Sequence, residues 1–238
     1  MKKSIIIFIS ISVIILVSLI LFFTLGKKNT SNTKITTKNT TPVTKKIELS
    51  ADEKPYISLI PSSEGHNLIF KVKDIPTKFT TAEYELIYTA KDENIEIEKG
   101  VSGTIELSGG VFEKDLLLGT ASCTNGCKYK YDEGVTGGIL TLTLKTNNKE
   151  YFSYETPFVL TNSTDINKEK KLTLIEENFI INGTVTSKSD YFIALKNLQS
   201  LYSVFSSGNG KGKITSIEPA TVIKTDLTSI TGDYTITQ

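Results

Sequence analysis

The feature that most constrains this chain is an uninterrupted apolar run near its N-terminus. The run covers Ser4–Leu25, 22 residues without a charge, a glycine or a proline, and a pair of lysines flanks it on each side. A helix rises about 1.5 Å per residue, so this segment would span roughly 33 Å, enough for a bilayer core of about 30 Å. The sequence therefore predicts a transmembrane helix over residues 4–25, with the lipid bilayer as a partner and residues 1–3 as a short tail.

We interpret this helix as an uncleaved signal anchor. A secretory signal has an apolar core of about 7–15 residues and a small-residue cleavage site, and this run is longer. Thr24 and Gly26 are small enough to precede a cut, so cleavage is the alternative. More lysines follow the run than precede it, which by the positive-inside rule would keep the bulk of the chain in the cytoplasm. A cysteine hairpin and a polar stalk favour the opposite orientation, with a cytoplasmic tail and an extracytoplasmic body.

The charge of the chain is unevenly distributed. Residues 1–46 carry eight Lys and no acid, a net +8, whereas residues 47–238 carry 19 Lys and 26 acids, a net −7, which together give +1. An acidic body argues against nucleic acid as a partner. Every basic residue is Lys, so the bidentate guanidinium fork that suits phosphate is missing.

Residues 26–50 are predicted to form a stalk. Between Asn29 and Lys46 the chain has seven Thr, three Asn and one Pro but only two large apolar residues, Ile35 and Val43. Such a segment cannot bury enough apolar surface to offset its conformational entropy. The stalk would therefore hold the body away from the membrane.

Beyond the stalk, apolar residues recur with a period of two, which is typical of β-strands. Leu140, Leu142 and Leu144 alternate with threonines, for example, and turn signals recur about every 8–12 residues. The predicted fold is all-β, with one N-terminal transmembrane helix followed by two immunoglobulin-like antiparallel β-sandwich modules. The modules are placed at residues 51–161 and 171–238, joined by a polar connector at 162–170.

One segment of the second module is ambiguous. Tyr191, Leu195, Leu198, Tyr202 and Phe205 share a helical stripe, whereas the run from Tyr191 to Leu195 also suits a buried strand. The surrounding pattern favours the strand.

The block Phe112–Lys145, FEKDLLLGTASCTNGCKYKYDEGVTGGILTLTLK, together with Phe158–Leu160, resembles a group of surface proteins. These are uncharacterised single-pass proteins of ultrasmall candidate-phyla bacteria, in which an apolar anchor precedes immunoglobulin-like β modules. The resemblance covers the first module well and the second only through the YFIALKNL segment. It implies an architecture and a location at the cell surface, and no activity.

Cys123 and Cys127 flank Thr-Asn-Gly, and Asn-Gly is a strong signal for a β-hairpin turn. Cysteines on either side of such a turn come within bridging distance, so we predict a disulfide at a hairpin tip. Free thiols are the alternative. A metal site would need four ligands, and the single histidine, His66, lies far away in the sequence. A redox motif would have two residues between the cysteines, and here there are three.

No other pattern indicates chemistry. His66 lies among turn-forming residues and is interpreted as a solvated loop histidine, and no nucleophile signature accompanies it. The acidic runs at Asp92–Glu98 and Asp132-Glu133 lack the spacing of a calcium loop. The aromatic pairs Tyr129/Tyr131 and Phe152/Tyr154 are interpreted as packing residues. We therefore predict no enzyme, no catalytic residues, no cofactor and no metal.

The sequence thus predicts a single-pass protein of the cell membrane that displays β modules for binding or adhesion. Its partner would be a protein or an envelope polymer that the sequence does not identify. The alternative function is a structural or assembly subunit of a cell-envelope complex.

Overall fold

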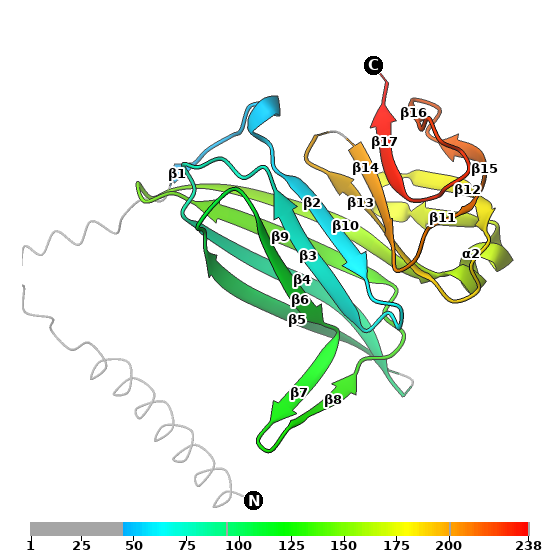
Figure 1. Cartoon of the computed structure of the whole chain (residues 1–238), viewed down its shortest axis with the longest axis horizontal. Coiled ribbons are helices and arrows are strands. Elements are labelled where there is room, and N and C mark those ends of the chain that lie inside the picture. Colours follow the sequence, from blue (N-terminus) through cyan, green and yellow to red (C-terminus); the bar gives the residue numbers. More distant parts are fainter. Residues whose placement is uncertain (1–44, 94, 200, 238) are drawn as a thin grey trace, which may run out of the picture. The chain divides into compact units, whose positions relative to one another are not determined.

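The computed structural model describes residues 45–93, 95–199 and 201–237, which belong to one compact unit (Figure 1). The predicted transmembrane helix and most of the predicted stalk lie outside these residues. Among the residues that the structure describes, no helix is long and apolar enough to cross a membrane.

The described chain is all-β apart from one short α-helix and two 3-10 helices, which confirms the predicted class. In the first half the elements are β1 (Lys45–Lys46), η1 (Ala51–Glu53), β2 (Tyr56–Pro61), β3 (Asn67–Lys73), β4 (Thr81–Asp92), β5 (Ile95–Glu106), β6 (Phe112–Leu117), β7 (Gly119–Cys123), β8 (Cys127–Tyr131) and β9 (Gly137–Lys145). In the second half they are β10 (Glu150–Asn162), α2 (Ser163–Glu169), β11 (Lys171–Leu174), η2 (Ile175–Glu177), β12 (Phe179–Val185), β13 (Tyr191–Asn197), β14 (Leu201–Ser206), β15 (Gly212–Glu218), β16 (Val222–Ile223) and β17 (Gly232–Ile236).

One large sheet runs through most of the body. Its strand order is β16-β17-β14-β13-β10-β9-β4-β5, and β1 pairs with β10 in addition. All neighbours are antiparallel except β1 and β10, which are parallel. Because side chains alternate between the faces of a strand, Leu140, Leu142 and Leu144 of β9 all point to one face, where they are buried.

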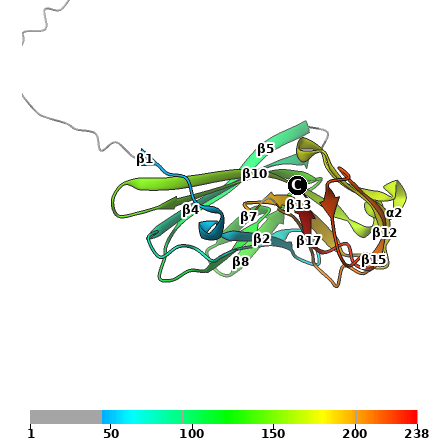
Figure 2. The same ribbon diagram turned by 90° about the horizontal axis from the view of Figure 1, so that it is seen from above.

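Two small sheets pack on opposite faces of the large sheet. The first small sheet, β2-β3-β6, encloses a core with β4, β9, β10 and β13, and the second small sheet, β11-β12-β15, encloses a separate core with β13, β14 and β17. Figure 2 shows β2 on one side of the molecule and β12 and β15 at the end where α2 lies. The body therefore has a three-layered region around β13.

Strand β13 is buried on both faces, and this explains its sequence. Ile193 and Leu195 belong to the first core, whereas Phe192 and Ala194 belong to the second. A strand covered on both sides needs an unbroken apolar run rather than an alternating one. The strand interpretation of this segment is confirmed, because β13 and β14 form an antiparallel hairpin with no helix.

The sequence predicts two separate modules, and the structure departs from this prediction in how residues 51–161 and 171–238 are joined. The two cores are distinct, but β10 and β13 lie side by side in one sheet, so residues 51–161 and 171–238 share that sheet. The predicted connector is also folded: Asn162 caps helix α2 by accepting a hydrogen bond from the Asp165 backbone N–H at 3.0 Å. Ile166 of this helix is buried in the second core.

The end of the predicted stalk also joins the body. The Lys45 N–H donates to the Lys149 carbonyl at 3.0 Å, and the Ile47 N–H donates to the Tyr151 carbonyl at 2.8 Å. Leu49 is buried in the first core. The apolar pair Ile47 and Leu49 therefore ends the stalk a few residues before the predicted boundary at residue 50.

A buried asparagine links the first small sheet to the large one. Asn197, at the end of β13, accepts from the Ile57 N–H at 3.1 Å and donates to the Ile57 carbonyl at 2.7 Å. Its amide also donates to Ser203 of β14 at 3.3 Å, and Ser203 in turn donates to Asp233 of β17 at 2.6 Å. Tyr56 donates to the same carboxylate at 2.8 Å. This network joins β2 to three strands of the large sheet.

Candidate functional site

Two surfaces of the body qualify as candidate binding sites. The first is the cysteine hairpin, which we define as residues 119–131, that is, β7, β8 and the turn between them. The two strands pair only with each other within the described chain, and Figure 1 shows them projecting away from the other strands. The structure joins Cys123 to Cys127 in a disulfide at the tip, with 4.1 Å between the Cα atoms. Asn125-Gly126 forms the turn, and Gly126 adopts a φ of 96°, in the region that favours glycine. The predicted disulfide is thus present.

The cysteine hairpin carries exposed aromatic rings. Tyr129 is 55% exposed and Tyr131 is 41% exposed. The ring of His66 stacks on Tyr131 with 4.3 Å between centroids and 7° between planes, and Tyr131 is parallel to Tyr129 at 6.2 Å. The prediction that Tyr129 and Tyr131 are packing residues therefore holds only in part, because the two rings stack on each other and on His66 but neither is buried in a core. For the other aromatic pair it holds, since Phe152 is buried.

The base of the cysteine hairpin is fixed by a buried carboxylate. Asp132 follows β8, and its side chain is only 4% exposed. It accepts a hydrogen bond from the Tyr88 hydroxyl at 2.8 Å and forms an ion pair with Lys99. Burial, together with this hydrogen bond, raises the pKa of Tyr88, so the hydroxyl stays a donor at neutral pH. Leu118, just before β7, is buried in the first core.

The cysteine hairpin differs in charge from the rest of the body. Lys128 and Lys130 lie on the face of β8 opposite the tyrosines, and residues 119–131 contain no acid. Residues 47–238 carry a net charge of −7, so two unopposed lysines make this element a local positive site on an acidic molecule. The rings on one face and the ammonium groups on the other give the hairpin two different contact surfaces.

The disulfide is expected to order the hairpin tip and to add little to global stability. Removing it with the double change Cys123→Ser and Cys127→Ser leaves both cores intact, because neither residue touches them. By the loop-entropy model a ring of about five residues constrains the unfolded chain by only roughly 2 kcal/mol. Hydrogen exchange of amides 120–130 should accelerate far more than that of β9, for which a loss of about 2 kcal/mol limits the acceleration to roughly 30-fold. Equal acceleration in the hairpin and in β9, beyond that limit, would contradict this assignment.

The second candidate surface is the Ile139 groove, where the second small sheet ends above the open part of the large sheet. It has a volume of about 650 Å³ and includes Gly138, Ile139, Pro157, Thr173, Ile175 and Glu176 among its lining residues. Strands β9 and β10 form the floor, and β11 with η2 forms the wall. Ile139 is 43% exposed and Ile175 is 74% exposed, although both are large apolar side chains.

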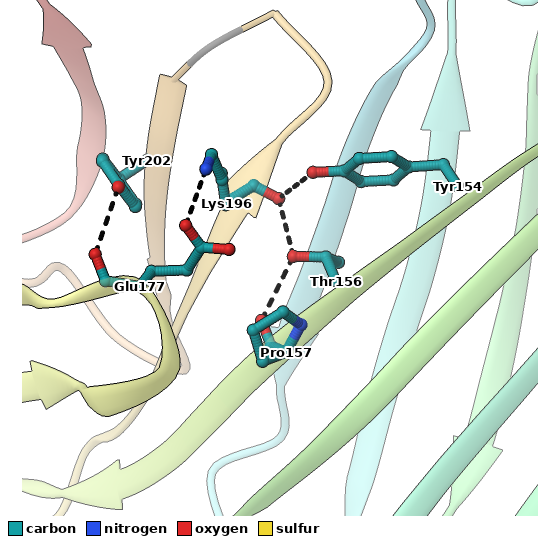
Figure 3. A network of polar contacts seen from close by, with 6 residues as sticks. All are labelled: Tyr154, Thr156, Pro157, Glu177, Lys196 and Tyr202. Atoms are coloured by element: carbon teal, nitrogen blue, oxygen red, sulfur yellow. Dashed lines mark hydrogen bonds and ion pairs between the residues drawn. The ribbon is translucent and has the colours of Figure 1, made fainter.

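A polar network at one end of the Ile139 groove holds its wall in place (Figure 3). Lys196 of β13 donates to the Glu177 carboxylate of η2 at 2.6 Å, and its backbone carbonyl accepts from Thr156 at 2.9 Å and from Tyr154 at 3.0 Å. The hydrogen bond to Glu177 raises the pKa of Lys196, so the Lys196 ammonium group stays protonated near neutral pH. The Tyr202 hydroxyl donates to the Glu177 carbonyl at 3.4 Å. Glu177 is therefore a fixed part of the wall.

The other residues considered at the sequence level are not brought together. The ring of His66 stacks on Tyr131, and within the described part of the chain it forms no hydrogen bond to an acid or a nucleophile. The neighbouring acids Asp132 and Glu133 do not form one site. Asp132 is buried at the base of the cysteine hairpin, whereas Glu133 is exposed and forms a backbone bridge to Lys91. Among the described residues, no group of three or more His, Cys, Asp or Glu side chains is placed to hold a metal ion. The absence of an enzymatic role stays a prediction.

Comparison of the chain with models of known protein families, with curated proteins and with solved structures finds no match. The functional assignment therefore depends on the two surfaces described above.

Proposed function

We propose that this protein is a membrane-anchored cell-surface protein that displays its β body for binding or adhesion. The anchor is the apolar run Ser4–Leu25, and the body is extracytoplasmic. The disulfide between Cys123 and Cys127 supports this location, because disulfides persist mainly in oxidising compartments outside the cytoplasm. We also propose that the strands of residues 51–161 and those of residues 171–238 are each arranged in an immunoglobulin-like way, although the two ranges share the large sheet.

The observation that carries the proposal is the cysteine hairpin. The rings of Tyr129 and Tyr131 contribute little to the stability of the fold, because neither ring is buried in a core. Exposed Tyr side chains at a rigid tip are typical of contact sites, because the ring offers a large apolar surface and the hydroxyl a hydrogen bond. The Asp132 anchor and the disulfide hold these rings in a defined position, which lowers the entropy that binding would cost.

The hairpin assignment predicts that the two rings carry the binding to a neighbouring cell or to an envelope polymer. The double variant Tyr129→Ala, Tyr131→Ala should lower retention of the body, residues 42–238, on isolated envelope fragments by about tenfold or more, because aromatic anchors of interfaces often contribute over 1 kcal/mol each. The melting temperature should change little, since neither ring is buried in a core and only the stacking contacts among Tyr129, Tyr131 and His66 are lost. Cosedimentation of the purified body with the fragments measures the effect.

A matched control removes two exposed apolar side chains elsewhere. Ile223 is 52% exposed and Leu227 is 48% exposed, so the double variant Ile223→Ala, Leu227→Ala should bind as the unchanged protein does. Equal losses in both double variants would contradict a role for the hairpin. Full retention in the tyrosine variant would do the same.

The alternative function, a subunit of an envelope assembly, is favoured by one observation. Strand β5 is twelve residues long and, among the described strands, pairs only with β4. An open strand edge can pair with another chain. Sedimentation of the purified body at about 100 µM, a concentration at which weak contacts form, distinguishes the two functions. A monomer that is retained on envelope fragments supports binding, whereas filaments without such retention support assembly.

A further inference from the structure

The Ile139 groove has a charge pattern that selects one kind of ligand. Its charged lining residues are all glutamates: Glu155 on the floor and Glu176 and Glu177 on the wall. Lys196 neutralises Glu177, as the ion pair in Figure 3 shows, but no salt bridge within the described chain engages Glu155 or Glu176. A cationic group in the groove would therefore meet two unopposed carboxylates.

The negative charge extends beyond the groove onto the adjoining sheet. We define the outward face as the side of β4, β5, β9 and β10 opposite the first core. The antiparallel register places eight charged side chains on it: Glu83, Glu85, Glu96, Glu98, Glu106 and Glu155 with Lys91 and Lys145. Six carboxylates and two ammonium groups give a net charge of −4. This field would attract a basic partner and repel phosphate polymers.

The floor also offers apolar contacts in a regular row. Ile87, Ile139 and Pro157 lie opposite one another on β4, β9 and β10, and Ile175 rises beside them from the wall. The next row on the same face, two residues along each strand, consists of Glu85, Thr141 and Glu155. An apolar row and an acidic row thus run in parallel about 7 Å apart, and each spans about 10 Å across three strands.

We propose that the Ile139 groove binds an extended segment of a partner protein in which lysine and aliphatic side chains are interspersed. Such a segment lies across β9 and β10, with its aliphatic side chains on the apolar row and its ammonium groups toward Glu155 and Glu176. The volume of about 650 Å³ is within the range of sites that bind short segments or small ligands. This site is separate from the cysteine hairpin and does not depend on it.

The test uses the body, residues 42–238, and the probe acetyl-Lys-Val-Lys-Val-Lys-Val-amide, with acetyl-Glu-Val-Glu-Val-Glu-Val-amide as its counterpart. In an NMR titration at about 50 mM salt, where surface charges are weakly screened, the lysine peptide should shift the amide signals of Gly138, Ile139 and Ile175. The glutamate peptide should shift none of them. Absence of lysine-peptide binding at millimolar concentration would overturn the proposal, and so would shifts confined to other surfaces.

Two matched charge reversals make the test specific. Glu155→Lys with Glu176→Lys should lower the affinity for the lysine peptide by about tenfold or more, since both changes replace attraction by repulsion in the groove. Glu48→Lys with Glu64→Lys changes the net charge by the same amount at exposed positions outside the groove, and should lower the affinity by less than about twofold. Equal losses of affinity in the two variants would show that binding depends on the charge of the whole body rather than on the groove, and this would overturn the proposed site. The Tyr129→Ala, Tyr131→Ala variant should bind the peptide normally, so failure of the hairpin proposal would leave this one intact.

Discussion

Replacing Phe192 by Ala should destabilise the entire body by about 3–5 kcal/mol, the range for deleting a buried aromatic ring. Phe192 is fully buried and faces the second core, while its neighbours in β13, Ile193 and Leu195, face the first. Because one strand is part of both cores, loss of either core removes a wall of the other. Urea unfolding followed by tyrosine fluorescence and by circular dichroism should show one transition, shifted in both signals.

The comparison is with Leu195→Ala on the opposite face of the same strand. That change should cost about 2–5 kcal/mol and shift the same single transition. An exposed control on the edge strand β16, Ile223→Ala, should change stability by no more than about 0.5 kcal/mol. Two separate transitions, with Phe192→Ala moving only one of them, would instead support two independently folding modules.

The second large effect is expected at Asn197. Replacing it by Ala leaves the N–H and the carbonyl of Ile57 without partners, and both are buried between β2 and β13. Each unsatisfied buried group costs about 1–3 kcal/mol, so the expected loss of unfolding free energy is about 2–6 kcal/mol. Differential scanning calorimetry of the body measures it.

Asn182 offers the matched control, because its amide also donates two hydrogen bonds, to Ser216 and Glu218, but in an exposed setting. Water replaces exposed hydrogen bonds, so Asn182→Ala should cost about 0.5 kcal/mol or less. If the two alanine variants were equally stable, the link from Asn197 to β2 would carry little of the stability of the fold.

Local patterns were enough to predict most strands and the disulfide. The alternation of Leu140, Leu142 and Leu144 identified a half-buried strand, and the turn between Cys123 and Cys127 identified a hairpin, because both signals act over a few residues. The run from Tyr191 to Leu195 suited a buried strand, although the same segment also fitted a helical stripe. It could not show which layers cover it, since the covering strands come from both ends of the body.

The binding surfaces could not be predicted in the same way. Tyr129 and Tyr131 alternate with lysines, as the residues of a half-buried strand do, and only the absence of a second layer over β8 leaves the rings exposed. The Ile139 groove combines residues from β9, β10 and η2, which are distant in the sequence. Asn197 and Ile57 are 140 positions apart. Such relations are set by sheet register and layer packing rather than by local composition.

The short strand β1 has a mechanical consequence for a tethered protein. If the body hangs from a membrane anchor, any pull on a bound partner is transmitted to the anchor through Lys45 and Lys46. These residues are held by two backbone hydrogen bonds to the rim of β10, from Lys45 to Lys149 and from Ile47 to Tyr151. Tension would break these bonds before it reached Leu49, which is buried in the first core, and residues 45–48 would then add about 13 Å of slack. The first response to load would be a lengthening of the tether, with the folded body and its binding surfaces left unchanged.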